Sequence, residues 1–266
     1  MILKGDKMKA FGGFVLLDIS GFEKNEILFN LKNMWKININ ADSKNYKESE
    51  NMLRFDFEDT DCVILYTEKK LKDEWMINRA RMNYNFENAV QICQNNVAYI
   101  TIGVTGDGRY VDLAILFNKI ASACLNTNNA RAIYCSHNFM EKSDYIRESY
   151  YLKNNYLPIE NLIYIGFIQK EDEVKHKIIT SAYSLGMKFF DKCELEIVES
   201  SEDIEKLRNR MLNIAYYIID NDILFTDEET ITISEKDDNG NVIPTKYTIN
   251  QEKSVNVNSV YSLKIK

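Results

Sequence analysis

The sequence predicts an α+β protein, with a mixed sheet covered by helices and a C-terminal antiparallel β segment. Three observations lead to this class. Strand-like and helix-like periodicities alternate through residues 14–168, as they do in layered α/β arrangements. The last third of the chain has short β-branched runs separated by turn residues. Hydrophobic residues make up 45% of the 266 residues, which is enough for a folded core and excludes general disorder.

Residues 14–104 are expected to contain four strands and two helices. Apolar and charged residues alternate over 53–58, the period of a strand with one wet face. Thr60-Asp61 is the expected turn after it, and Asp73 is expected to cap a long helix that runs to about Cys93. The expected strands are 14–17, 53–58, 62–66 and 97–104, and the expected helices are 22–35 and 73–93.

Residues 110–168 continue the alternation. Helical spacing of apolar residues covers 110–125, and a helix of mixed polarity is expected over 139–153. Buried-strand runs occupy 130–135 and 162–168. This β–α–β–α–β order indicates a partly parallel sheet covered by helices.

The C-terminal third has a different pattern. A short strand over 194–198 precedes an amphipathic helix capped by Ser200 or Ser201. A hairpin turn is expected at residues 238–241, and the expected strands are 230–233, 246–249 and 260–265. No Pro/Gly/Ser-rich linker divides the chain. We therefore expect residues 1–266 to form a single compact domain, with a subdivision near 172–180 as the alternative.

The charge balance bears on the kind of partner. The net charge of -7 and the pI near 5.1 disfavour direct binding of nucleic acid. Acidic residues crowd one strand and its turn, so we consider a docking surface for a protein with a basic surface, where charge speeds association. A solvated strand face explains the same pattern. The candidate partner-binding residues are Asp56, Glu58, Asp59 and Asp61.

Cysteine and histidine usage argues against a metal centre or cofactor. The five cysteines are widely spaced among apolar neighbours and contain no Cys-x-x-Cys pair, as in reduced core residues of a cytoplasmic protein. His137 and His176 are the only histidines, too few for a zinc site or a Ser-His-Asp triad. No segment approaches about 18 apolar residues, so no membrane span is expected.

Two further constellations are candidate sites. Glu194 and Glu196 are two apart on an expected strand and so share one face. That geometry suits a carboxylate pair in a metal-dependent hydrolase, and equally an exposed strand edge. The Gly-rich turn over Gly103–Arg109 lies between a strand and a helix, where it is a candidate site for a nucleotide or other small molecule in a sensor protein. Its spacing matches neither the dinucleotide fingerprint nor the P-loop, and a left-handed turn is the plainer interpretation.

One resemblance extends over most of the chain after about Cys62. The segments that carry it are residues 183–190, 194–197, 213–218, 227–231 and 263–265, with weaker echoes at 119–122, 132–134 and 163–167. In these segments the sequence resembles a bacterial family known as domain of unknown function 4261, which shows Tyr-Thr-aromatic-Gly-Leu, then Phe-Gly, then Glu-x-Glu-Ile.

The departures from the family pattern concern glycines above all. Asp191 stands where the family has a glycine after Phe190, and Glu228 and Thr232 replace two others. Histidines that commonly precede the strand at 97–101 and a Pro-rich segment near 68–75 are also lacking. The resemblance implies no settled activity, but members resemble proteins of bacterial toxin–immunity and conflict loci.

These observations favour a non-catalytic cytoplasmic protein that binds a macromolecular partner. An immunity protein or an inhibitor of a bacterial defence nuclease is the specific form of this hypothesis. The hydrolase built on Glu194 and Glu196, and the sensor built on Gly103–Arg109, are the alternatives.

Overall fold

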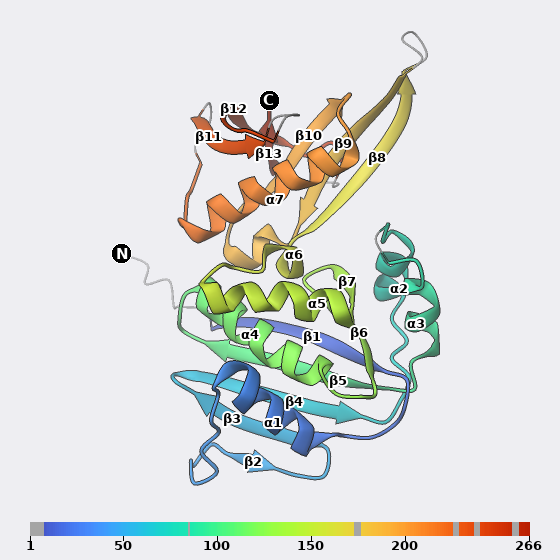
Figure 1. Ribbon diagram of the computed structural model, residues 1–266, viewed down its shortest axis with the longest axis vertical. Coiled ribbons are helices and arrows are strands. Elements are labelled where there is room, and N and C mark those ends of the chain that lie inside the picture. The colour runs from blue at the N-terminus through green and yellow to red at the C-terminus, as the bar shows by residue number, and fades with distance from the viewer. Residues whose placement is uncertain (1–7, 85, 173–176, 226–228, 237–239, 257–260) are drawn as a thin grey trace. The chain divides into compact units, whose positions relative to one another are not determined.

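The chain folds into two compact units, Met1–Leu162 (unit 1) and Ile163–Lys266 (unit 2). The computed structural model describes residues 8–84, 86–172, 177–225, 229–236, 240–256 and 261–266. Each unit contains one sheet of its own, which confirms the α+β class (Figure 1). The boundary between the units lies ten residues before the subdivision near 172–180 that the sequence analysis considers. The prediction of a single domain stays a prediction.

Sheet A of unit 1 has seven strands in the order β2-β3-β4-β5-β1-β6-β7. Every pairing in it is antiparallel. The expected parallel pairing is wrong here, because β1 lies between β5 and β6 and is antiparallel to both. The strands are β1 (Lys9–Leu17), β2 (Lys47–Glu48), β3 (Met52–Phe57), β4 (Thr60–Thr67), β5 (Ala98–Gly106), β6 (Ala130–Cys135) and β7 (Asn138–Glu141).

Helices cover the two faces of sheet A unequally. Helix α4 packs on β1, β5 and β6, and α1 packs on α4, whereas α2 and α3 pack on β6 and β7 (Figure 1). Leu16, Met76, Ala132 and Phe139 belong to the core under α2 and α3. The helices of unit 1 are α1 (Lys24–Trp35), α2 (Glu74–Arg81), α3 (Ala89–Asn95), α4 (Tyr110–Leu125), α5 (Lys142–Ser149), the 3₁₀ helix η1 (Tyr150–Asn154) and α6 (Ile159–Leu162).

Two expected helices of unit 1 differ from the structure. The single helix over 73–93 is two helices, α2 and α3, although Asp73 caps the first by accepting a hydrogen bond from the Met76 amide at 3.0 Å. The intervening Asn83 instead donates to the Phe139 carbonyl. The helix expected from Phe139 begins at Lys142, because a tight turn with positive φ at Ser136 and His137 pairs β7 with β6.

Sheet B of unit 2 has six strands in the order β11-β12-β13-β10-β9-β8. Its β10–β13 pairing is parallel and the others are antiparallel, so this is the mixed sheet. The elements are β8 (Tyr164–Asp172), β9 (Lys177–Leu185), the 3₁₀ helix η2 (Met187–Phe190), β10 (Glu194–Ser200), α7 (Ile204–Asp220), β11 (Glu229–Lys236), β12 (Val242–Lys253) and β13 (Tyr261–Ile265).

Helix α7 covers one face of sheet B through buried Leu207, Met211, Ile214 and Ile218. Its N-cap is Asp203, which accepts a hydrogen bond from the Glu205 amide at 2.8 Å, and not Ser200 or Ser201 as expected. The hairpin turn expected at residues 238–241 falls partly outside the described residues.

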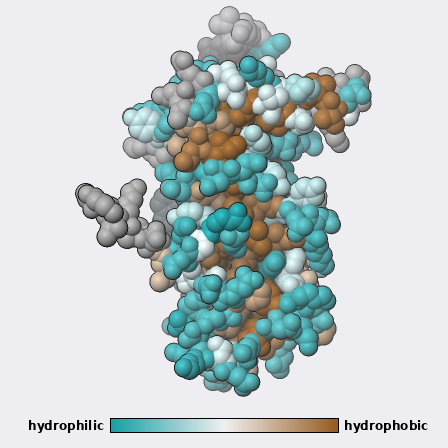
Figure 2. Space-filling model, turned by 90° about the vertical axis from the view of Figure 1, so that its left-hand side faces the viewer, coloured by the Kyte–Doolittle hydropathy of each residue, from teal (hydrophilic) through white to brown (hydrophobic). Residues whose placement is uncertain are grey.

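The surface of the described residues is mixed. Figure 2 shows hydrophilic side chains over much of one side of the molecule, with hydrophobic side chains gathered between them. None of the helices in the described ranges has the length and apolar content needed to span a membrane.

Candidate functional site

One face of sheet A is open over β3, β4, β5 and β1. The face that α1 and α4 cover carries buried residues of these strands, such as Leu53, Ile64 and Ile102. On the other face the alternate residues are only half-buried or exposed. Leu16 of this face is buried under α2 and α3, whereas Gly12 and Phe14 of the same face are exposed and half-buried. We call the part of this face that the described residues leave accessible the open face.

Two glycines occupy the centre of the open face, so no side chain covers the backbone there. The strand registers place Val63, Gly103 and Gly12 side by side across β4, β5 and β1. A Cβ built on Gly103 would meet no atom within 4 Å, and one on Gly12 would meet only the Ile102 carbonyl oxygen, at 3.4 Å. Glycine inside a strand allows another backbone or ligand to approach closely. The centre of the open face therefore has room for a second layer.

The next row of the open face has two large apolar side chains on either side of a threonine. Leu65, Thr101 and Phe14 are register neighbours across β4, β5 and β1, and the Phe14 ring meets Tyr99 edge-on with centroids 6.0 Å apart. Leu65 and Phe14 are half-buried. Apolar side chains in this position lose water contact when a second layer packs on the sheet.

The candidate acidic residues lie at one end of this face. Asp56 and Asp61 are a cross-strand pair on it, and Glu58 and Asp59 form the two-residue turn between β3 and β4. The turn is thus two residues earlier than the expected Thr60-Asp61. The structure brings all four candidates into one hairpin.

These four carboxylates are not equivalent. Arg54 donates to both oxygens of Asp61, at 2.8 and 3.0 Å, and Asn45 donates to Asp56. Glu58 and Asp59 are exposed, and among the described residues they form no ion pair. The steering charge of the hairpin is therefore carried chiefly by Glu58 and Asp59.

Glu194 lies on β10 with its side chain buried, at 4% exposure. It accepts hydrogen bonds from the Ser184 hydroxyl at 2.6 Å and from the amides of Gly186, Met187 and Lys188 at 3.0, 3.3 and 3.4 Å. A carboxylate that accepts several backbone amides fixes the loop that carries them. Glu194 thus anchors the start of η2.

Glu196 is buried on the same strand, at 1% exposure. It accepts from the Ser254 hydroxyl and the Asn256 amide, both at 2.8 Å, and from the Ser262 hydroxyl at 2.7 Å. Buried Lys264 of β13 forms an ion pair with it. Burial alone would raise the pKa of Glu196, but Lys264 and the hydroxyl and amide donors lower it to about 2.

These contacts change the interpretation of the carboxylate pair. Both oxygens of Glu194 and of Glu196 already accept bonds from donors of unit 2. Among the described residues, no group of three or more His, Cys, Asp or Glu side chains is placed to hold a metal ion. Glu194 and Glu196 therefore act as structural residues, each of which holds a neighbouring segment of unit 2 in place.

The Gly103–Arg109 segment is mostly strand. Gly103 and Gly106 belong to β5, and Gly103, Gly106 and Gly108 all avoid positive φ, so the left-handed turn expected there is wrong. Lys9 donates to the Gly108 carbonyl at 3.0 Å, and Arg109 donates to Asp112 at 2.8 and 2.9 Å. Asp112 thus places a carboxylate in the first turn of α4.

The cysteines and histidines have different surroundings. Burial raises the pKa of Cys62 and of Cys135 to about 12 and that of Cys93 to about 11, with smaller effects of nearby side chains. These thiols are therefore protonated at neutral pH and suited to core packing. His137 is exposed in the β6–β7 turn at φ 66°, and His176 lies outside the described residues.

Sequence reasoning missed the open face itself. Its signal is present in the sequence as Gly12 and Gly103 inside two strand-like runs. Only the register of β1 against β5 shows that these glycines are neighbours, and that register joins segments about 90 residues apart.

Comparison with known proteins gives one family. Residues 183–266 match the model of the family described as Domain of unknown function (DUF4261), so this part of the chain is similar to that family. The match begins on β9 and lies within unit 2. The weaker upstream echoes, over 119–122, 132–134 and 163–167, lie outside the matched residues. Searches of the curated proteins and of the solved structures found no match.

Proposed function

We propose that this chain is a non-catalytic cytoplasmic protein that binds a basic protein partner through the open face of sheet A. An immunity protein or an inhibitor of a defence nuclease is the form of this function we favour. The observation that carries the proposal is the open face with two glycines at its centre, bordered at one end by the acidic β3–β4 hairpin.

The chemistry of the face suggests the partner. A sheet face with half-buried Leu65, Phe14 and Val63 gains stability when an apolar stripe packs on it. The acidic hairpin favours basic residues at one end of that stripe, because opposite charges raise the association rate and select the orientation. An amphipathic helix with a basic end meets both requirements, and the bare backbone at Gly12 and Gly103 lets it approach closely.

Capture from the native cell tests the proposal, with one substitution that blocks the face. Gly103→Val places a branched side chain at the centre of the open face, where a Cβ meets no atom within 4 Å. Gly108→Val is the matched control, because its Cβ is equally unobstructed but lies after the end of β5. Both variants should unfold at nearly the wild-type denaturant concentration.

We expect a basic protein to be retained by the wild type and by Gly108→Val and to be lost from Gly103→Val. Retention of the same protein by a folded Gly103→Val variant would place the binding surface elsewhere. Turnover of a substrate by the purified chain would contradict the non-catalytic assignment.

A further inference from the structure

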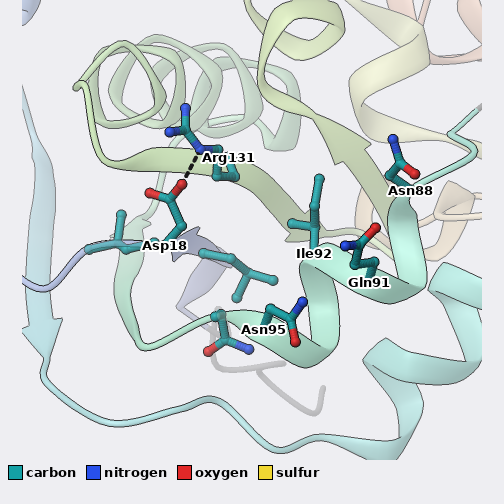
Figure 3. A pocket seen from close by; sticks show the side chains of 9 residues that line it. Asp18, Asn88, Gln91, Ile92, Asn95 and Arg131 are labelled. Carbon is teal, nitrogen blue, oxygen red and sulfur yellow. Dashed lines mark hydrogen bonds and ion pairs between the residues drawn. The ribbon is translucent and has the colours of Figure 1, made fainter.

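A second site, independent of the open face, lies in a groove of about 320 Å³ in unit 1. The groove runs between α3 and the C-terminal end of β1, and its lining includes Arg131 of β6 (Figure 3). Its volume is near the lower limit for sites that hold small molecules, about 300 Å³. Leu16 and Leu17 lie beneath it at 0% and 1% exposure, and half-buried Ile92 provides the accessible apolar side chain of its lining.

A β-bulge places the charged residue of the groove. Leu16 pairs with Ala132 and Leu17 pairs with Ala130, so Arg131 is an extra residue that faces no partner on β1. Bulges redirect a side chain and occur often beside binding sites. The Arg131 guanidinium then reaches Asp18, which follows β1, and its Nε donates to the Asp18 carboxylate (Figure 3).

The backbone around the ion pair is fixed by hydrogen bonds, but some polar atoms of Arg131 and Asp18 remain available to a ligand. The Asp18 amide donates to the Asn129 carbonyl at 3.1 Å, and the Asn129 side chain donates to the carbonyls of Ile19 and Gly21 at 3.2 and 2.9 Å. Only Nε of Arg131 and one oxygen of Asp18 are used by the pair. Within the described ranges, the terminal nitrogens of Arg131 and the second oxygen of Asp18 have no hydrogen-bond partner.

The opposite wall is uncharged and polar. Asn88, Gln91 and Asn95 line the groove from the N-cap and body of α3 (Figure 3). Their spacing places them along one side of the helix. All three are exposed, and each amide both donates and accepts hydrogen bonds. This wall therefore accommodates polar groups of either kind.

The charges select the ligand class. Arginine binds carboxylates through paired N–H groups, whereas the free oxygen of Asp18 suits an ammonium group. A purely anionic ligand would meet Asp18, and a purely cationic ligand would meet Arg131. We propose that the groove binds a free α-amino acid, with its carboxylate on Arg131, its ammonium on Asp18 and an aliphatic side chain against Ile92.

Titration calorimetry with leucine tests this site in the full chain. We expect leucine to bind, and N-acetyl-leucine and 3-methylbutylamine, which lack the ammonium and the carboxylate respectively, to bind at least tenfold more weakly. Arg131→Gln and Asp18→Asn should each weaken leucine binding at least tenfold. Lys170→Gln is the control, because it removes an exposed ion pair with Glu199 in unit 2 and should leave the affinity unchanged.

A further variant tests the groove without changing Arg131, which lies at the bulge, or its ion pair. Ile92→Trp fills the groove from α3 without touching the ion pair, and we expect it to abolish leucine binding. Absence of binding by the wild type at millimolar leucine would overturn the proposal. Equal affinity for N-acetyl-leucine would also overturn it, in favour of a site for carboxylates alone. Open-face binding is measured separately with Gly103→Val, so failure of one site leaves the other testable.

Discussion

At the scale of single residues, the two glutamates of the Glu-x-Glu-Ile segment hold neighbouring segments of unit 2 in place. Glu194 holds the amides at the start of η2, and Glu196 holds the segment after β12 together with Lys264 of β13. Both segments are brought to β10 from other parts of unit 2. A buried carboxylate with several donors achieves this where an apolar residue would leave amides unsatisfied.

Replacing Glu196 tests this anchoring role. Glu196→Gln leaves Lys264 buried without its counter-charge, so we expect a loss of about 3–5 kcal/mol in the free energy of unfolding at pH 7. Urea unfolding followed by circular dichroism measures it. Glu252→Gln is the control, because the pair of Glu252 with Lys266 is exposed and should be worth at most about 1 kcal/mol. Equal effects of the two variants would contradict the anchoring role.

The pH dependence of stability follows from the same group. The pKa of Glu196 is lowered from an ordinary value of 4.5 to about 2 in the folded chain. Its contribution is therefore fully present above about pH 4.5 and is lost as the pH falls from there towards 2. Unfolding titrations at pH 6, 4 and 3 should show this loss in the wild type and a smaller one in Glu196→Gln.

Asp191 is a non-glycine residue in a left-handed backbone conformation. It follows η2 with φ of 58°, in the left-handed region where glycine carries little steric penalty. We expect Asp191→Gly to raise the free energy of unfolding by about 0.5–1 kcal/mol. Asp220→Gly, at the end of α7, serves as the control and should not stabilise. A neutral or destabilising Asp191→Gly would mean that its carboxylate has a compensating contact.

At the scale of elements, hydrophobic periodicity correctly predicted the bounds of a helix and a strand of unit 1. Helix α4 and strand β6 begin and end at the expected residues, 110–125 and 130–135. The prediction of one helix over 73–93 was wrong, because the break between α2 and α3 depends on packing against β7 as well as on the helix propensity of the residues there. The open face and the groove were missed because both arise from strand registers, and β1 pairs with strands that follow it by about 90 residues or more.

The β3–β4 hairpin gives a kinetic prediction for the proposed docking. Glu58 and Asp59 occupy its exposed turn, so Glu58→Lys with Asp59→Lys should leave stability within about 0.5 kcal/mol. Association with the captured basic partner should slow, and its salt dependence should flatten, because screening acts over roughly 8–10 Å at physiological ionic strength. Stopped-flow measurements at two salt concentrations decide this. Unchanged association would make the turn a solvated surface.

At the scale of the whole molecule, the question is whether a protease can separate the two units. Unit 1 and unit 2 each have a sheet and buried residues of their own. The junction is nevertheless short, because α6 ends at Leu162 and β8 begins at Tyr164. Leu162 and Ile163 are buried, at 0% and 2% exposure. A protease therefore finds no accessible linker there, and limited digestion should not cut between residues 159 and 164.

Unfolding with two probes shows whether the units are one cooperative domain. Both tryptophans, Trp35 and Trp75, lie in unit 1, so their fluorescence reports that unit alone, whereas circular dichroism also reports α7 of unit 2. Separate sheets and cores lead us to expect that Glu196→Gln moves the circular dichroism transition to lower urea while the fluorescence midpoint stays in place. If both midpoints move together, the units unfold as one, and the single domain predicted from the sequence is correct.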